Sequence, residues 1–177
     1  MLTLVAASLF GSLGIWQLGR AGEKRAIFAA YALGTTGALQ EGLGGANAGE
    51  QRYQLLRLQG HYDAGRQVLL DNMSHAGRSG YQVLTPFITA GGSVLVNRGW
   101  VPASGDRGRL PDIEVSDQLR LLTGRIDRLP RPALRLAADA AVSAAPWPRR
   151  LLFPTVAEIS TQTGYALRDF QLLLNPD

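Results

Sequence analysis

The sequence feature that most constrains the fold lies within residues 80–102, GYQVLTPFITAGGSVLVNRGWVP. An alternating run of residues 80–89 and a second run of residues 93–96 flank the pair Gly91-Gly92, a pattern typical of a β-hairpin with a tight turn. The second run leads directly into a polar, cationic and aromatic cluster, residues 97–100 (NRGW). The sequence therefore predicts a strand pair that ends in a corner with the chemistry of a binding surface.

The chain from residue 52 onward has the texture of a β-protein. Further strands are predicted at residues 53–62, 67–72, 118–127 and 170–174, with a polar loop at 104–117. Residues 129–148 contain four prolines, which cannot donate to a ladder, so this segment is predicted to be irregular.

One short helix is predicted at residues 156–163. Thr155 and Glu158 have the spacing of a capping box, in which each side chain satisfies a backbone amide of the other residue. Gly164 then suits the position after a helix C-terminus.

The N-terminal residues 2–18 are uncharged and apolar, apart from Thr3, Ser8, Ser12 and Gln17. As a helix they would span roughly 25 Å at ~1.5 Å per residue, close to the ~30 Å apolar core of a bilayer. A signal peptide would carry a basic start and a cleavage site, and a buried helix would need a large core around it. We therefore predict a transmembrane helix with Trp16 near the interface.

Three regions follow from these patterns: a membrane anchor with a following helix (1–39), a Gly/Ala/Asn-rich linker (40–51) and a mainly-β domain (52–177). The predicted fold class is α+β, mainly antiparallel β in a curled or barrel-like sheet, with the N-terminal transmembrane helix and a short C-terminal helix. Positive charge follows the anchor and would favour a cytoplasmic body, but this rule weakens for long domains.

The charge balance bears on possible partners. The chain has a formal net charge of +4 and a pI near 10.0. Its arginines are scattered, however, and no nucleic-acid-binding motif is present, so we predict no nucleic-acid partner. The chain contains no cysteine, which excludes disulfides and thiolate chemistry.

Catalytic motifs are sparse. The sequence has neither the Gly-x-Ser-x-Gly elbow of hydrolases nor a His-Glu-x-x-His zinc helix. His61 and Asp63 share one face of a predicted strand and His75 follows in the next turn, so a metal-dependent enzyme using these three residues is the alternative function. The simpler interpretation is a solvent-facing pair and a polar turn.

Arg98 and Trp100 leave two interpretations open. Arginine offers a planar fork for carboxylates, and tryptophan offers a large contact area with one donor, as binding surfaces use them. Alternatively, Arg98 pairs with a neighbouring acid and Trp100 closes the end of a core. Gly99, between them, is expected to mark a bend or a close backbone approach.

Four segments, in order, resemble the surfeit locus protein 1 family of cytochrome c oxidase assembly factors. They are residues 13–20 (LGIWQLGR), residues 53–72, the pair 80–87 and 94–102, and residues 147–164. The resemblance covers nearly the whole chain, and the 80–102 segment is its most specific part. Met73 departs from the family pattern, which often has arginine there, and Thr155 replaces a frequent aspartate.

The resemblance implies no catalytic and no metal-binding residues. The residues that it implies in partner or haem-related binding are Trp16, Gln17, Arg20, Gly80, Tyr81, Pro86, Asn97, Arg98, Gly99 and Trp100.

The function that the resemblance implies is that of a membrane-anchored assembly factor rather than an enzyme. It would assist cytochrome c oxidase biogenesis through haem a delivery to, or maturation of, subunit I. The implied partners are subunit I, haem A synthase and membrane lipid. The implied location is the bacterial inner membrane, with the body facing the periplasm.

The C-terminal end departs from the family pattern. Members usually continue into a second membrane helix, and the histidine implicated in haem a binding lies in that region. This chain stops at Asp177, so it resembles a C-terminally incomplete member, and haem a is expected only for a full-length one. His61 and His75 do not match that histidine.

Overall fold

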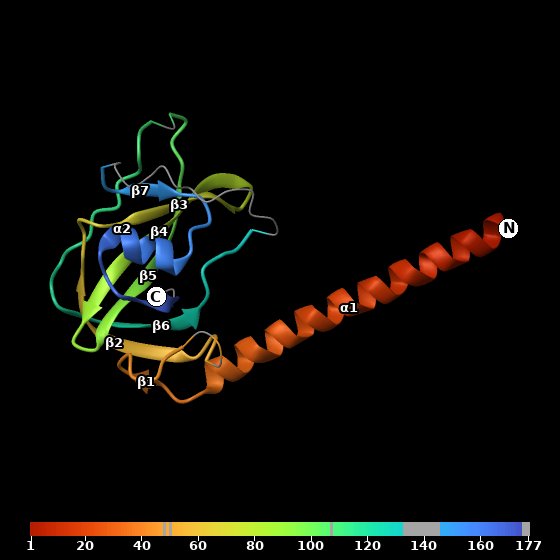
Figure 1. Ribbon diagram of the computed structural model, residues 1–177, viewed down its shortest axis with the longest axis horizontal. Coiled ribbons are helices and arrows are strands. Elements are labelled where there is room, and N and C mark those ends of the chain that lie inside the picture. Colours follow the sequence, from red (N-terminus) through yellow and green to blue (C-terminus); the bar gives the residue numbers. More distant parts are fainter. Residues whose placement is uncertain (48, 50, 107, 133–145, 175–177) are drawn as a thin grey trace.

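The computed structural model describes residues 1–47, 49, 51–106, 108–132 and 146–174 (Figure 1). The described part of the chain is mainly β with two helices, as the sequence predicts. The elements in chain order are α1 (Leu2–Thr36), β1 (Gln40–Glu41), β2 (Leu55–Tyr62), β3 (Val68–His75), β4 (Arg78–Thr89), β5 (Gly92–Pro102), β6 (Arg120–Asp127), β7 (Arg149–Leu151), α2 (Val156–Thr163) and β8 (Leu167–Leu174).

Within the described residues, five strands close into a barrel in the order β2-β6-β8-β5-β4. β4 closes it by pairing back with β2, where Gly60 lies opposite Thr89. A Cβ at residue 60 would overlap the Ile88 carbonyl, so the two strands can meet only because this residue is glycine. Barrel neighbours are antiparallel except β5 and β8, which are parallel. The predicted barrel-like sheet is confirmed, whereas the parallel pair was not predicted.

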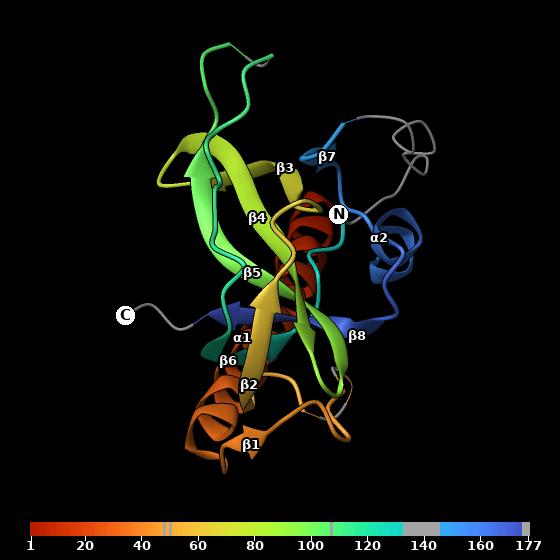
Figure 2. The same cartoon turned by 90° about the vertical axis from the view of Figure 1, so that its left-hand side faces the viewer.

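The β4–β5 hairpin is the longest strand pair, and Figure 2 shows β8 and β6 crossing one end of it while β3 lies beside the other. On the side of β4 away from β5, the pairing strand changes along its length. β4 pairs with β3 up to Leu84 and with β2 from Phe87 onward. Pro86 lies between these two stretches, where its missing N–H interrupts neither ladder. Its carbonyl oxygen accepts a hydrogen bond from the Asp63 backbone N–H at 2.9 Å.

Several predicted element boundaries need correction. The strand predicted at residues 93–96 continues as β5 to Pro102, so the NRGW cluster lies inside a strand and not at its end. β1 and β7 have two and three residues, too few for a periodic pattern, and the sequence did not predict them. Most of the segment predicted as irregular, residues 133–145, lies outside the described residues.

The predicted short helix is confirmed as α2. The Thr155 hydroxyl accepts from the Glu158 backbone N–H at 3.2 Å, and the Glu158 carboxylate accepts from the Thr155 N–H at 2.7 Å. Gly164 ends the helix at φ 75°, a conformation that glycine adopts without strain.

Three clusters of buried residues form the core. The largest fills the barrel and draws on all five of its strands, together with Leu43 and Ala46 from the segment before β2. A second cluster packs α2, through Ile159, against Leu84 and Leu95 on the outer side of β4 and β5. A third surrounds Tyr81. Residues 40–47 therefore supply part of the barrel core.

Helix α1 projects away from the barrel as one continuous helix (Figure 1). Its contact with the body lies near its C-terminus, where the Tyr31 ring packs edge-on against Tyr53 with centroids 5.5 Å apart, and Arg125 hydrogen-bonds the Tyr31 hydroxyl. Gly34 lies so close to the Tyr53 backbone that an added Cβ would be 2.6 Å from its carbonyl carbon.

The predicted transmembrane helix is only partly supported. The helix itself is confirmed. Among the residues that the structure describes, however, no helix combines the length and the apolarity that a bilayer span requires.

Candidate functional site

A β-bulge holds the NRGW cluster within β5. Gln82 pairs with Trp100 and Leu84 with Asn97, so two residues of β5 lie opposite one residue of β4. Gly99 adopts φ 104°, which side-chain-bearing residues rarely adopt, while a Cβ there would meet nothing within 4 Å. Gly99 therefore marks a bend, as predicted, and not a close approach.

Asn97 is the buried centre of an amide network. Its exposed fraction is 4%, and its Oδ1 accepts from the Gly99 backbone N–H at 3.0 Å. Its Nδ2 donates to the side-chain oxygens of Gln82 at 3.2 Å and Gln171 at 3.1 Å. Asn97 thus ties β5 to both of its neighbours, β4 and β8.

Arg98 points inward and fastens a loop to the barrel. Its guanidinium donates to the Ile113 carbonyl at 2.8 Å, the Glu114 carbonyl at 3.0 Å and the Gln67 side-chain oxygen at 2.8 Å. All three acceptors are neutral, so the predicted alternative of an acid partner is wrong. Burial lowers the pKa of Arg98, an effect that Tyr62 opposes and Arg120 reinforces.

Tyr62 lies beside two arginines. The guanidinium carbons of Arg98 and Arg120 lie 5.8 and 5.1 Å from its ring centroid, within the range of cation–π attraction. Burial raises the pKa of the Tyr62 hydroxyl, and the two cations oppose that shift. The aromatic ring, rather than a carboxylate, is thus the neighbour that offsets part of the cost of burying Arg98.

Trp100 packs flat over a glycine. A Cβ added at Gly80 would lie 2.5 Å from two ring atoms of Trp100, so the ring occupies the space that a side chain would need. The indole N–H donates to the Met73 carbonyl at 3.0 Å, and the His75 ring lies 5.4 Å from the indole. Gly80 and Trp100 therefore act together as a packing unit.

The other predicted site residues fall into two groups. Tyr81 and Pro86 are buried in β4, Tyr81 with an exposed fraction of 1%. Trp16, Gln17 and Arg20 are exposed on α1, where Arg20 pairs only with Glu23 at 3.2 Å. The structure brings the β4 and β5 residues together and leaves the helical ones apart from them (Figure 1).

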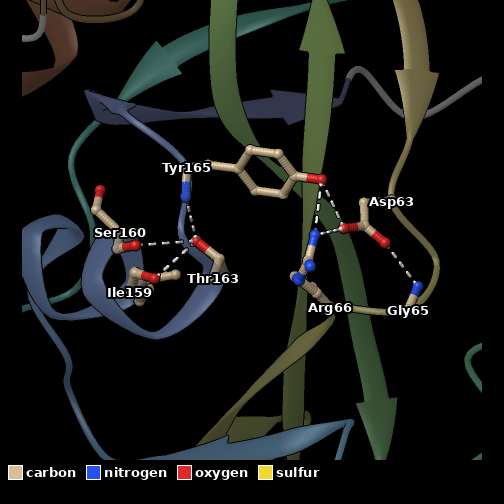
Figure 3. A network of polar contacts seen from close by, with 7 residues as sticks. All are labelled: Asp63, Gly65, Arg66, Ile159, Ser160, Thr163 and Tyr165. Atoms are coloured by element: carbon tan, nitrogen blue, oxygen red, sulfur yellow. Dashed lines mark hydrogen bonds and ion pairs between the residues drawn. The ribbon is translucent and has the colours of Figure 1, made fainter.

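The alternative metal site is wrong. Asp63 accepts from the Tyr165 hydroxyl at 2.8 Å, from Arg66 at 3.0 Å and from the Gly65 backbone N–H at 2.9 Å (Figure 3). His61 is exposed on β2, and His75 packs on Trp100. No group of three metal-ligating side chains occurs within the described part of the chain.

The Asp63 network has a structural explanation. Figure 3 shows Tyr165, which follows α2, reaching across to the turn after β2, where Asp63 and Arg66 meet. Thr163 closes the end of α2 by donating to the Ile159 carbonyl at 2.8 Å. Burial and the hydrogen bond to Asp63 raise the pKa of Tyr165. The network joins the β2–β3 turn to the α2–β8 turn.

A haem site does not fit the described residues. His61 borders a polar hollow, shared with Asp63, Arg66 and Asp117, and the His75 ring lies 5.4 Å from the indole ring of Trp100. In the described ranges, neither histidine faces an apolar cavity of the kind that a haem fills.

A hollow of about 480 Å³ lies beside the Asn97 network and was not predicted. Its lining includes Gln82 and Gln171, which Asn97 holds, and also Arg52, Arg128 and Arg131. A larger hollow of about 780 Å³ shares Arg128, Leu129 and Arg131 with it. No periodic signal could have indicated Arg128 and Arg131, because Arg128 follows the predicted strand 118–127 and Arg131 lies in the stretch predicted as irregular.

The comparison with known proteins identifies the family. Residues 4–176 match the SURF1 family, which is associated with cytochrome c oxidase assembly and consists of assembly factors, not known enzymes. No match was found among the curated proteins. Because the family match covers nearly the whole chain, the chain belongs to the SURF1 family.

Proposed function

We propose that this protein is an assembly factor of cytochrome c oxidase that works by binding and positioning a partner. The observation that carries the proposal is the family match over residues 4–176. The structure is consistent with a binding role. The side chains of Asn97, Arg98 and Trp100 hydrogen-bond to neighbouring strands and to a loop, and so they fix the shape of the surface around them.

The finer role rests on the family resemblance. We propose that the protein assists maturation of subunit I, including its supply with haem a, and that haem A synthase is a second partner. In this proposal the described residues contribute by holding and orienting protein partners.

We further propose that the protein acts at the bacterial inner membrane with its barrel in the periplasm. The exposed apolar side chains of α1, among them Phe10 (70% exposed) and Ile15 (74% exposed), would contact lipid. Since the chain contains no cysteine, a single Ser104→Cys variant would report orientation cleanly. Labelling of intact cells by a membrane-impermeant maleimide is expected, and labelling only after lysis would contradict a periplasmic barrel.

Complementation tests the proposed function. The complete gene product that contains this chain would be expressed in a bacterium whose own family member is deleted. Restored oxidation of cytochrome c and a restored haem a absorption band in the membranes are expected. The Arg78→Gln variant, which changes an exposed residue at the β3–β4 turn, serves as a control and should complement equally.

Co-purification adds a test of the partners. Subunit I or haem A synthase should be recovered with the tagged protein from solubilised membranes. The proposal would be contradicted if oxidase activity were no higher than with an empty vector in cells where immunoblotting shows the protein in the membrane.

A further inference from the structure

Several hydrogen-bond donors of the hollow beside Asn97 have no acceptor within the described part of the chain. Its volume of about 480 Å³ falls in the ~300–1,000 Å³ range of small-molecule sites. The side chains of Arg128 and Arg131 border it, and both residues are exposed. Neither guanidinium has a partner among the residues that the structure describes.

The orientation of the two glutamines in this hollow follows from chemistry. The Gly99 backbone N–H can only donate, so the atom of Asn97 facing it is Oδ1, and Nδ2 is the atom that donates to Gln82 and Gln171. Both glutamines must therefore present their oxygens to Asn97. Consistently, the Gln171 Nε2 donates to the Arg128 carbonyl at 2.9 Å.

This orientation leaves the amide nitrogen of Gln82 with its two N–H donors. Gln82 lines the hollow, and its Nε2 has no partner within the described ranges. Asn97 is thus a positioning residue: by occupying the acceptor of Gln82, it leaves that side chain only donors to offer.

The acidic side of the hollow is already neutralised. Asp127 is the carboxylate in its lining, and one of its oxygens accepts from Arg52 Nε at 2.7 Å and from the Arg128 backbone N–H at 2.8 Å. The net charge of the lining is therefore positive, and an anion could accept from those donors that have no partner among the described residues.

We propose that this hollow binds an oxyanion group, a phosphate or a carboxylate, of a small ligand. Arg128, Arg131 and Gln82 donate to the oxyanion, while Asn97 holds Gln82 in place. The apolar side chains of Leu129 and Leu173 border the rest of the ligand. This site is independent of the proposed role in oxidase assembly.

Calorimetric titration of the purified full chain with inorganic pyrophosphate and with citrate tests the site. Ionic strength is held constant with sodium chloride, so that general screening is equal in every run. Saturable one-to-one binding is expected. Arg128→Gln or Arg131→Gln should weaken it about tenfold, the loss expected for one charged hydrogen-bond donor.

The Gln82→Glu variant is the sharpest probe. Glutamate can still accept from Asn97, but it replaces the free donors with a negative charge, so anion binding should be lost. Arg78→Gln changes the net charge equally at an exposed residue that does not line the hollow, so it should leave the affinity unchanged. The two arginine variants alter exposed side chains, so they test the site even if Gln82→Glu fails to fold.

The outcomes are distinct. Binding of pyrophosphate alone supports a phosphate ligand, binding of citrate alone supports a carboxylate ligand, and binding of both supports a shared oxyanion site. Absence of binding at millimolar concentrations, or equal affinity in Arg131→Gln and Arg78→Gln, would overturn the proposal.

Discussion

Helix α1 and the barrel use their apolar residues in opposite ways. In the barrel, Phe87 and Phe170 are completely buried among residues of neighbouring strands. In α1, Phe10 and Ile15 are 70% and 74% exposed. Exposed apolar surface of this extent marks a surface that contacts something outside the chain. Contacts within the chain thus stabilise the barrel, whereas the apolar side chains of α1 need a partner outside the chain to be shielded from water.

The largest expected difference between the two regions concerns glycines. Gly80→Val would force a side chain into the space of the Trp100 ring and should lower the free energy of unfolding by at least about 3 kcal/mol, since overpacking displaces backbone. Gly14→Val on α1 meets nothing within 4 Å. Urea unfolding followed by tryptophan fluorescence would compare them, and equal midpoints would break the contrast.

Arg98 and Arg20 provide the next comparison. Arg98→Met leaves the carbonyls of Ile113 and Glu114 without their donor and should cost about 2 kcal/mol, because the part-buried Ile113 carbonyl and the exposed Glu114 carbonyl both lose a charged hydrogen-bond donor. Arg20→Met removes an exposed ion pair and should change the barrel by less than about 0.5 kcal/mol.

Limited proteolysis adds a local measurement for the arginine pair. In Arg98→Met the loop that contains Ile113 and Glu114 should be cleaved faster, because its fastening is gone. Unchanged cleavage at this loop would show that Arg98 does not hold it.

The bulge glycine should give a smaller effect. Gly99→Ala places a side chain at φ 104° and is expected to cost about 1 kcal/mol of conformational strain, with no steric clash. A Gly99→Glu variant should be destabilised at least as much. Thermal unfolding measures both, and an unaltered melting temperature would contradict a strained backbone at this position.

The smallest effect is a pH dependence of the barrel. Burial raises the pKa of Tyr62 above the unfolded value of about 10, so the folded state holds this proton more tightly. The resulting stabilisation is complete below about pH 10 and is lost as the pH rises through the folded value. Tyr62→Phe should therefore lose less stability than the parent protein above pH 10.

In the Tyr62→Phe variant, the stability should still fall at alkaline pH, because the pKa of Tyr165 is also raised. The expected result is thus a shallower curve of unfolding free energy against pH, not a flat one. Parallel curves for the parent protein and Tyr62→Phe would show that Tyr62 does not contribute to the pH dependence of stability.

The local elements were largely predictable from short-range signals. The capping box at Thr155 and Glu158 and the tight glycine-containing turn of the β4–β5 hairpin are signals that act within a few residues. The turn was predicted one residue too late: it consists of Ala90 and Gly91, and Gly92 already pairs with Thr89 in the ladder. The continuation of β5 to Pro102 was missed because a bulge hides the alternation, and it depends on a backbone conformation at Gly99 that no periodic pattern reveals.

The candidate site was predicted in its residues but not in its arrangement. The motif residues Asn97, Arg98 and Trp100 lie close together in the chain, yet each has a different role. Asn97 belongs to an amide network, Arg98 binds a loop, and Trp100 packs on Gly80. Their partners, such as Gln171 and Ile113, lie far along the chain or in segments without a motif. Side-chain partners of this kind are chosen by strand register, which short-range patterns do not encode.

The sequence by itself determined the β-rich body, the short capped helix, the apolar character of α1 and the family. These properties follow from local propensity, periodicity and motif order, which act over a few residues at a time. Only the tertiary structure decided that β4 closes the barrel on β2, that Arg98 turns inward to carbonyls, and that Asn97 orients Gln82 beside Arg128 and Arg131. These outcomes depend on which strands become neighbours, because burial and hydrogen-bond partners exist only once the chain has brought distant residues together.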